Sequence, residues 1–251
     1  MATEGADRAV PAPSDAGTVE YFEHHVHEYS ARRLRPAVAF INQHKPADAA
    51  LIDIGCGAGN VLAHLAESTG IATLAGLDVS ERCVVLTRER VPAAGVHQAS
   101  VLDPATVDRF RDTFDFAVLA AVVHHLVGPT RRQSRQLARD AVANALQLVK
   151  PGGYLIVMEP TFVPAPSVFV LFWLKTVLSR IFHRRLPVGG YWNNVGAPVV
   201  SYYSSGQLRA MLHDRPDTEI VLVDEQPQRL GKLAGLVVSK SNTTVVAART
   251  A

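Results

Sequence analysis

The sequence predicts an α/β fold in which a mostly parallel sheet is covered by helices on both faces. From Ala49 onward, short apolar runs alternate with amphipathic stretches, as in successive strand–helix–strand units. The runs that resemble strands are almost continuously apolar, which is typical of strands buried on both faces. The chain has 251 residues, of which 48% are hydrophobic and 19% charged, so a disordered or fibrous protein is excluded.

The predicted elements follow in order. Five apolar runs read as strands, at residues 50–55, 72–77, 96–99, 114–120 and 154–158. Helical spacing of apolar residues fills the gaps, most clearly from Ser80 to Pro92 and over residues 131–149, where Lys150-Pro151-Gly152-Gly153 blocks continuation. Residues 219–223 and 243–247 form two further strands with no convincing helix between them. We therefore expect this last pair to be antiparallel.

Charge and targeting signals narrow the class of protein. The net charge of +2 is too balanced to indicate nucleic-acid binding. The two cysteines form no disulfide framework, and the first residues lack a basic, apolar secretory pattern, so we expect a cytoplasmic protein. We interpret residues 1–17 as a disordered tail. The most apolar stretch, residues 160–174, contains three prolines and is shorter than the roughly 20 residues of a membrane span.

The most informative segment is a glycine-rich loop after the first strand, Asp53-Ile54-Gly55-Cys56-Gly57-Ala58-Gly59-Asn60. Such glycines allow a tight turn and a close approach of the backbone to a ligand, and the following helix directs its free N–H groups at it. A nicotinamide fingerprint would require a third glycine where Asn60 stands, and the lysine of a P-loop is absent. Asp78, at the end of the second strand, can accept both hydroxyls of a ribose.

These motifs, in this order, resemble the class I S-adenosylmethionine-dependent methyltransferases over about residues 21–160. The segments Ala120-Ala121-Val122-Val123-His124-His125-Leu126 and Leu148-Val149-Lys150-Pro151-Gly152-Gly153 are similar to two further motifs of that family. The resemblance implies S-adenosyl-L-methionine as cofactor. It implies that the glycine loop holds the methionine part of the cofactor and that Asp78 binds the ribose. Residues 79 and 100–103 would lie at the adenine. Ala120 would lie where the chain closes over the cofactor, and a tyrosine of the lid would reach it. The implied cofactor-binding residues are Tyr29, Asp53, Gly55, Gly57, Gly59, Asp78, Val79, Leu102, Asp103 and Ala120.

The resemblance also implies a Rossmann-like seven-stranded sheet whose last strand lies antiparallel between strands five and six. This agrees with the two helix-poor strands near the C-terminus. We accordingly expect a helical lid over residues 18–48 and a methyltransferase domain over residues 49–251. A hydrophobic helical insertion is expected at about residues 161–205.

Three residues are candidates for proton transfer: His124, His125 and Glu159. Each also has a structural interpretation, since the two histidines could position the cofactor and Glu159 could shape the floor of a pocket. Asp103 precedes a proline and could simply cap a helix. The run His24-His25-Val26-His27 has no carboxylate or cysteine partner nearby, so we expect a solvated helix face and no metal site. We expect Cys56 to be a packing residue.

The predicted insertion over residues 161–205 is expected to influence which acceptor the protein binds. Its apolar face could pack on the sheet or on a second subunit of a homodimer, form a wall for a lipophilic acceptor, or rest on a membrane surface through its basic end. Tyr202 and Tyr203 suit the mouth of a pocket. We expect a small, largely apolar or aromatic acceptor, methylated at O, N or C, and not a nucleic acid. Two alternatives stay open: methylation of a membrane lipid or quinone, and a cofactor-binding module without catalysis.

Overall fold

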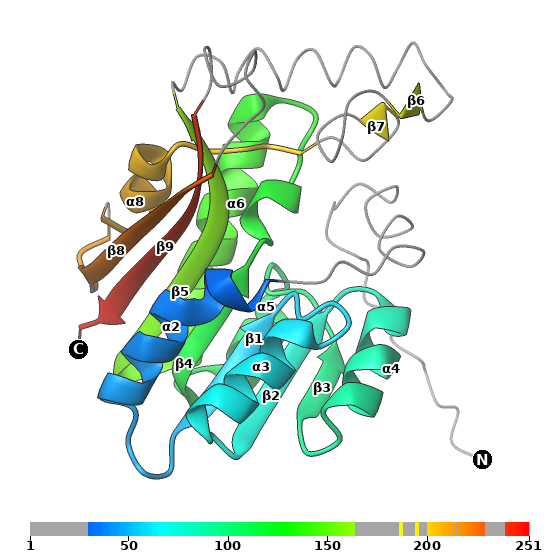
Figure 1. Ribbon diagram of the computed structural model, residues 1–251, viewed down its shortest axis with the longest axis vertical. Coiled ribbons are helices and arrows are strands. Elements are labelled where there is room, and N and C mark those ends of the chain that lie inside the picture. The colour runs from blue at the N-terminus through cyan, green and yellow to red at the C-terminus, as the bar shows by residue number, and fades with distance from the viewer. Residues whose placement is uncertain are drawn as a thin grey trace.

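The structure, a computed structural model, describes residues 30–163, 186–187, 194–195, 200–213, 215–228 and 239–250. These residues contain a seven-stranded sheet of order β3-β2-β1-β4-β5-β9-β8 (Figure 1). Its strands are β1 (Ala50–Ile54), β2 (Thr73–Asp78), β3 (Gly95–Gln98), β4 (Phe114–Ala120), β5 (Val149–Val163), β8 (Thr218–Gln228) and β9 (Ser239–Arg249). The first five strands are parallel, and β9 is antiparallel to both of its neighbours. The predicted fold class is therefore confirmed, including the antiparallel last strand.

Helices cover both faces of the sheet (Figure 1). The described helices are α2 (Ala31–His44), α3 (Asn60–Thr69), α4 (Glu81–Arg90), α5 (Pro104–Phe110), the 3₁₀ turn η1 (Val123–His125), α6 (Arg131–Leu148) and α8 (Ser205–His213). Apolar side chains of α2 and α3 pack on one face of the sheet, and those of α5, α6 and α8 pack on the other. A separate two-stranded pair joins β6 (Leu186–Pro187) to β7 (Asn194–Val195). Of the described helices, each is too short or too polar to cross a membrane.

The core is built on the alternation of side chains along the central strands. In β5, Leu155 and Val157 pack with α6 and α8, whereas Ile156 and Met158 pack with α2 and α3. All four side chains are at most 2% exposed. Fully burying an aliphatic side chain of this size contributes about 1.5–3 kcal/mol. The strands are therefore a rigid base from which the loops of the site project.

Predicted boundaries differ from the structure at β5, β8 and β9. Strands β8 and β9 extend beyond the predicted residues 219–223 and 243–247. Helix α6 ends at Leu148, and β5 begins at once with Val149, five residues before its predicted start. The register between β4 and β5 shifts at this point, where Phe114 pairs with Val149 and Phe116 already pairs with Tyr154. This irregularity accommodates the proline and glycines that had indicated a turn. Strand β5 also continues to Val163, past the predicted start of the insertion.

Several predicted features lie outside the described residues. They are the tail over residues 1–17, the beginning of the lid with Tyr29, and most of the insertion, including its proposed apolar helix. The described part of the lid is α2, which buries Leu34, Ala37 and Ile41 against the sheet. Helix α8 begins at Ser205, where the predicted insertion ends.

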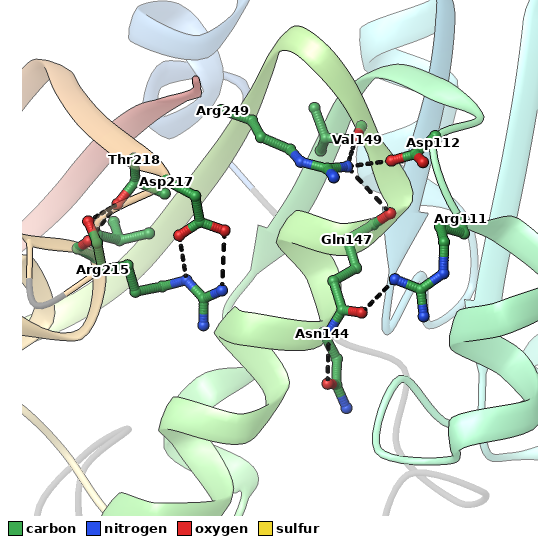
Figure 2. Close-up of polar contacts among 10 residues, drawn as sticks. Arg111, Asp112, Asn144, Gln147, Val149, Arg215, Asp217, Thr218 and Arg249 are labelled. Atoms are coloured by element: carbon green, nitrogen blue, oxygen red, sulfur yellow. Dashed lines mark hydrogen bonds and ion pairs between the residues drawn. The ribbon is translucent and has the colours of Figure 1, made fainter. Parts of the chain in front are cut away.

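The edge at which the parallel strands begin, called the amino edge below, carries paired charges (Figure 2). The Arg249 guanidinium donates hydrogen bonds to the Asp112 carboxylate and to the backbone oxygen of Val149. Arg215 holds the Asp217 carboxylate through two hydrogen bonds of 3.1 and 3.0 Å. The contacts of Arg249 connect the end of β9 to the starts of β4 and β5, whereas the Arg215–Asp217 pair is local to the turn before β8.

The opposite edge, called the carboxyl edge below, gathers the predicted site residues. Asp53 lies near the end of β1, Asp78 ends β2 and Ala120 ends β4. Glu159 lies in β5, one residue beyond the position that pairs with Ala120. Parallel strands present the same end to one edge of a sheet, so residues far apart in sequence meet there.

Candidate active site

The loop between β1 and α3 (residues 55–59, the glycine loop) adopts a backbone conformation that favours glycine. Gly55, Gly57 and Gly59 have φ angles of 73°, 54° and 76°. A Cβ atom at position 55 would lie 2.6 Å from Cγ2 of Val122, so a larger residue would clash. A Cβ atom at position 57 would have no described atom within 4 Å. Gly57 therefore presents bare backbone to a space that a ligand can approach closely.

Neighbouring elements fix the loop in place. The N–H groups of Gly55 and Cys56 both donate to the backbone oxygen of Leu77 in β2, at 2.7 and 2.9 Å. The Thr87 hydroxyl of α4 donates to the backbone oxygen of Gly57 at 2.7 Å. The Cys56 side chain is 5% exposed, and burial raises the pKa of its thiol well above the usual range. Cys56 is thus protonated at neutral pH, which agrees with a packing role.

Asp53 is a buried carboxylate to which the described residues donate no hydrogen bond of good geometry. It is 1% exposed. Burial raises the pKa of Asp53 to about 7; the nearby charge of Asp78 adds to the shift, and the Leu62 backbone N–H opposes it. An unsatisfied buried carboxylate is costly, so its position favours a bound cationic group.

Asp78 lies at the same edge and faces the glycine loop. Its two carboxylate oxygens accept hydrogen bonds from the N–H groups of Gly57 and Ser80, at 2.8 and 2.9 Å. Burial outweighs these bonds and raises the pKa of the carboxyl. An ionised carboxylate has about four acceptor sites, so further donors such as sugar hydroxyls can still bind. The next residue, Val79, is 41% exposed, an unusual position for an apolar side chain beside a buried acid.

The segment after β3 takes a helix-capping conformation. The two carboxylate oxygens of Asp103 accept from the Ala105 N–H at 3.1 Å and from the Thr106 hydroxyl at 3.2 Å, which caps α5. Leu102 is partly buried against the core, and its N–H donates to the Ser100 hydroxyl. The capping interpretation of Asp103 is therefore observed, and its contact with adenine stays a prediction.

A strained turn follows β4. Ala120 ends the strand, and Ala121 has a φ of 58°, a left-handed conformation that costs an alanine about 1–2 kcal/mol. The Ala121 N–H donates to the backbone oxygen of Met158 at 2.8 Å, which holds the turn on β5. Backbone strain of this kind clusters at functional sites. Here it turns the chain into η1 and directs His124 toward Glu159.

Glu159 and His124 form a buried pair. The Nδ1 atom of His124 lies 2.6 Å from one Glu159 carboxylate oxygen, and the Val123 N–H donates to the other at 2.6 Å. Glu159 is 1% exposed, and burial raises its pKa to about 7. The centres of the His124 and His125 rings are 4.0 Å apart, and the hydrogen bond to the Glu159 carboxylate is formed by His124. The sequence names both histidines, and the geometry separates them.

Two residues of this site were missed or only partly anticipated. The Tyr202 ring stacks on the His124 ring at 5.3 Å and meets the Phe162 ring edge-on at 4.6 Å. The sequence indicates Tyr202 as an aromatic near a pocket but gives no partner for it. Arg131 is 7% exposed at the start of α6 and binds the backbone of Tyr202. The sequence does not predict this burial, because an arginine in a helix rich in charged residues is normally exposed.

The remaining site predictions fall elsewhere. Tyr29 and His24, His25 and His27 lie outside the described residues. Within the part of the chain that is described, no group of three or more histidine, cysteine or acidic residues could hold a metal ion.

A methyltransferase-domain family matches most of the chain, over residues 22–215. The chain therefore belongs to the class I S-adenosylmethionine-dependent methyltransferases, and it is an enzyme of that class with S-adenosylmethionine as its cofactor. The carboxyl edge fits this group. The unsatisfied Asp53 carboxylate suits a donor that carries positive charge, and Gly57 leaves space beside it.

Individual relatives are more distant. The dTDP-3-amino-3,6-dideoxy-alpha-D-glucopyranose N,N-dimethyltransferase of Streptomyces fradiae is 26% identical over 210 residues, which cover 82% of this chain and 77% of that protein. Trans-aconitate 2-methyltransferase of Acidovorax ebreus (strain TPSY) is 33% identical over 140 residues, covering 55% of this chain and 49% of that protein. The second match thus spans about half the length of that relative.

A solved structure supports the fold alone. The geranyl diphosphate C-methyltransferase of Streptomyces coelicolor A3(2), in complex with Mg²⁺, geranyl diphosphate and S-adenosyl-L-homocysteine, superposes with a TM-score of 0.64. The two chains are 12% identical, and the likeness covers 96% of this chain and all of the other. At this identity it carries no information about the acceptor of this enzyme.

Proposed function

We propose that this enzyme methylates a small, largely apolar acceptor at an oxygen, nitrogen or carbon atom, with His124 as the general base. The observation that carries the proposal is the 2.6 Å contact between His124 Nδ1 and the buried Glu159 carboxylate. A base oriented by a third group is a recurring arrangement for proton transfer. His125, the other candidate, lies with its ring 4.0 Å from that of His124, and its charge opposes the rise in the pKa of Glu159, so the test below compares the two histidines.

The cofactor residues are proposed from geometry and resemblance together. S-adenosylmethionine, when bound, supplies a methyl group on a sulfonium that is already activated for displacement. The glycine loop and Asp53 would hold its methionine part, and Asp78 would accept its ribose hydroxyls. Val79 would pack on the adenine, which accounts for its exposure. Leu102 and Ala120 border the same edge of the sheet.

The chain's remaining task is to hold the acceptor in line, exclude water and accept a proton. With the Nδ1 proton directed at Glu159, the lone pair of the His124 ring lies on Nε2, and that atom would take the proton. The ionised Glu159 carboxylate stabilises the positive charge that then forms on the ring. Glu159 is a positioning residue in this account.

The acceptor class is supported by the relatives' names. They act on a dTDP-linked amino sugar and on trans-aconitate. Both are small molecules, and the first name specifies methylation of nitrogen. The apolar character rests on this chain's own residues: the Tyr202 ring stacked on His124, the Phe162 ring against Tyr202, and the apolar run at residues 160–174.

The test compares the two histidines. Transfer of a labelled methyl group would be measured with a panel of phenols, amines and carbon acids, and affinity for S-adenosyl-L-homocysteine by calorimetry. We expect His124→Ala to lower turnover roughly 10²–10⁴-fold, the usual contribution of a general base, with cofactor affinity unchanged. His125→Ala is the matched control and should lose less than about tenfold. Equal losses in the two variants would contradict this assignment of the base.

A further inference from the structure

The chain returns to the sheet in a short extended segment (residues 200–203, the return segment) that lies directly against η1. The Ser201 N–H donates to the backbone oxygen of His124 at 2.8 Å. Two residues later, the backbone oxygen of Tyr203 accepts from the Phe162 N–H at 3.0 Å. The return segment therefore joins the end of β5 to the turn that carries His124.

Side chains of the return segment point alternately to opposite sides, as in a strand. Ser201 and Tyr203 face α6: the Tyr203 hydroxyl donates to the backbone oxygen of Ser134 at 3.2 Å and accepts from the Ser201 hydroxyl at 3.1 Å. Tyr202 points the other way. Its ring lies 5.3 Å from the His124 ring, with the two planes 20° apart. The imidazole is therefore covered on one face by the phenol ring.

Arg131 holds this segment in place. Its guanidinium donates to the Ser201 hydroxyl and to the backbone oxygen of Tyr202, and it lies 4.7 Å above the ring of Tyr203. Two local costs oppose an arginine at this position. A cation at a helix N-terminus is disfavoured by the helix dipole, and burial of the guanidinium lowers its pKa. The hydrogen bonds to the return segment and the contact with the Tyr203 ring offset these two costs. We therefore interpret these contacts as the structural role of Arg131.

We propose that Arg131 is a positioning residue that acts through Tyr202 on the imidazole of His124. Glu159 and Tyr202 restrict different motions of the ring. The Glu159 hydrogen bond fixes the direction of Nδ1, whereas the stacked phenol fixes the plane in which the ring lies. Both are needed to aim Nε2 at one point. The inference rests on the proposed function, in which Nε2 of His124 takes the acceptor's proton.

A lysine cannot replace the arginine in this role. The guanidinium is a rigid fork that donates to two acceptors and stacks on a ring, whereas an ammonium group is a point charge on a flexible chain. Arg131→Lys therefore keeps the positive charge but loses the paired hydrogen bonds to Ser201 and Tyr202. Arg132→Lys makes the same exchange at the next, exposed residue and is the matched control. Tyr202→Ala removes the stacked ring, and Tyr202→Phe keeps it.

The readout is the ring N–H proton of His124, followed by nuclear magnetic resonance in protein labelled with ¹⁵N-histidine and saturated with S-adenosyl-L-homocysteine. In the wild type, we expect a slowly exchanging Nδ1 proton, because it lies in a short, buried hydrogen bond to a carboxylate. Arg131→Lys and Tyr202→Ala should accelerate its exchange with water about tenfold or more. Arg132→Lys and Tyr202→Phe should leave it unchanged.

Kinetics supply the second readout. With any acceptor that the wild type methylates, Arg131→Lys should lower kcat about tenfold or more, since a misplaced base loses near-attack geometry, while the KM for S-adenosylmethionine stays constant. Unchanged proton exchange in both Arg131→Lys and Tyr202→Ala would overturn the proposal. If Arg131→Lys fails to fold by circular dichroism, Tyr202→Ala decides, because it leaves the Arg131–Ser201 contact in place.

These outcomes are separable from those of the proposed function. The proton signal reports how His124 is held, whether or not His124 is the base. A normal turnover in His124→Ala would contradict the proposed function and leave the signal as predicted. If His124 is the base and Arg131 only positions it, kcat should fall less in Arg131→Lys than in His124→Ala.

Discussion

The two edges of the same sheet treat charge in opposite ways. At the amino edge, Arg249 is bonded to Asp112, and Arg215 holds Asp217 through two hydrogen bonds that lower the pKa of that carboxyl (Figure 2). At the carboxyl edge, burial raises the pKa of Asp53 to about 7, and neither of its oxygens accepts a good hydrogen bond from the described residues. One edge stabilises the folded chain, and the other leaves charge unsatisfied.

The difference indicates where a ligand is needed. A carboxylate paired with an arginine lowers the free energy of the folded state, whereas a buried carboxylate without a partner raises it by about 1–3 kcal/mol or more. The carboxyl edge also contains a second buried acid, Glu159. A left-handed residue other than glycine occurs at each edge, Ala121 at the carboxyl edge and Asp112 at the amino edge, so backbone strain does not distinguish them. The buried acids do, and substitutions at the two edges should therefore have opposite effects.

The largest effect is expected at Glu159. Glu159→Gln should lower turnover roughly 10²–10³-fold, because a neutral amide cannot stabilise the charge that forms on His124. Cofactor affinity, measured by calorimetry with S-adenosyl-L-homocysteine, should be unchanged. A variant that retains wild-type turnover would show that the buried pair has no part in the reaction.

The same pair predicts a pH dependence. Turnover requires ionised Glu159, so it should fall about tenfold per pH unit as the pH drops below about 7, the raised pKa of this carboxyl. The charged or titratable groups near it are His124, His125, Arg33, Tyr202 and Tyr203. In Glu159→Gln only His124 of this pair titrates, and no carboxylate stabilises its charged form, so the acid limb of the residual activity should move to lower pH. An acid limb at the same pH in that variant would show that Glu159 does not set it.

The next largest effect is expected at Asp53, where one substitution should weaken cofactor binding and stabilise the ligand-free protein. Asp53→Asn should weaken the binding of S-adenosyl-L-homocysteine roughly 10–100-fold, the scale of a charged contact. The same substitution should stabilise the ligand-free protein by roughly 1–3 kcal/mol, because it removes an unsatisfied buried charge. Calorimetry and thermal unfolding measure the two. Loss of both affinity and stability would indicate a purely structural aspartate.

The pH dependence of stability follows from the same carboxyl. In the folded state Asp53 keeps its proton up to about pH 7, whereas in the unfolded chain it loses the proton near its ordinary pKa of 3.8. The folded state therefore binds more protons between these values, and the stability of the ligand-free protein falls as pH rises through this window. Asp53→Asn should reduce the difference in Tm between pH 5.5 and pH 7.5.

The smallest effect is expected at the amino edge. Arg249→Ala removes hydrogen bonds to Asp112 and to the Val149 backbone, and should destabilise the protein by roughly 1–2 kcal/mol, about 2–4 °C in Tm per kcal/mol. The dissociation constant of S-adenosyl-L-homocysteine should not change. Arg132→Ala, on an exposed helix face, is the control. A change in cofactor affinity in Arg249→Ala would contradict the claim that the amino edge contributes to stability and not to cofactor binding.

The sequence predicts the parts of the molecule that local patterns encode. Strand runs such as residues 114–120 and the helix that follows Ser80 depend on neighbours in the chain, and the structure has them where expected. The glycine spacing and the acid after β2 locate the carboxyl edge, because strand order places them together. The antiparallel last strand follows from the missing helix before it.

Long-range contacts are not encoded in this way. Two adjacent histidines look alike in sequence, and only the position of Glu159 on the neighbouring strand separates them. Asp103 is compatible with a ligand contact and with a cap, and the cap is what the structure contains. The burial of Arg131 depends on the path of the chain some 70 residues later, at the return segment.

Calorimetric titration of S-adenosyl-L-homocysteine into the wild type and Asp78→Ala tests most directly whether the carboxyl edge is the cofactor site. We expect saturable one-to-one binding to the wild type. Loss of the carboxylate should weaken it by roughly 1.5–3 kcal/mol, since hydrogen bonds to a charged group are removed. Failure of the wild type to bind, or equal affinity in both proteins, would contradict the account.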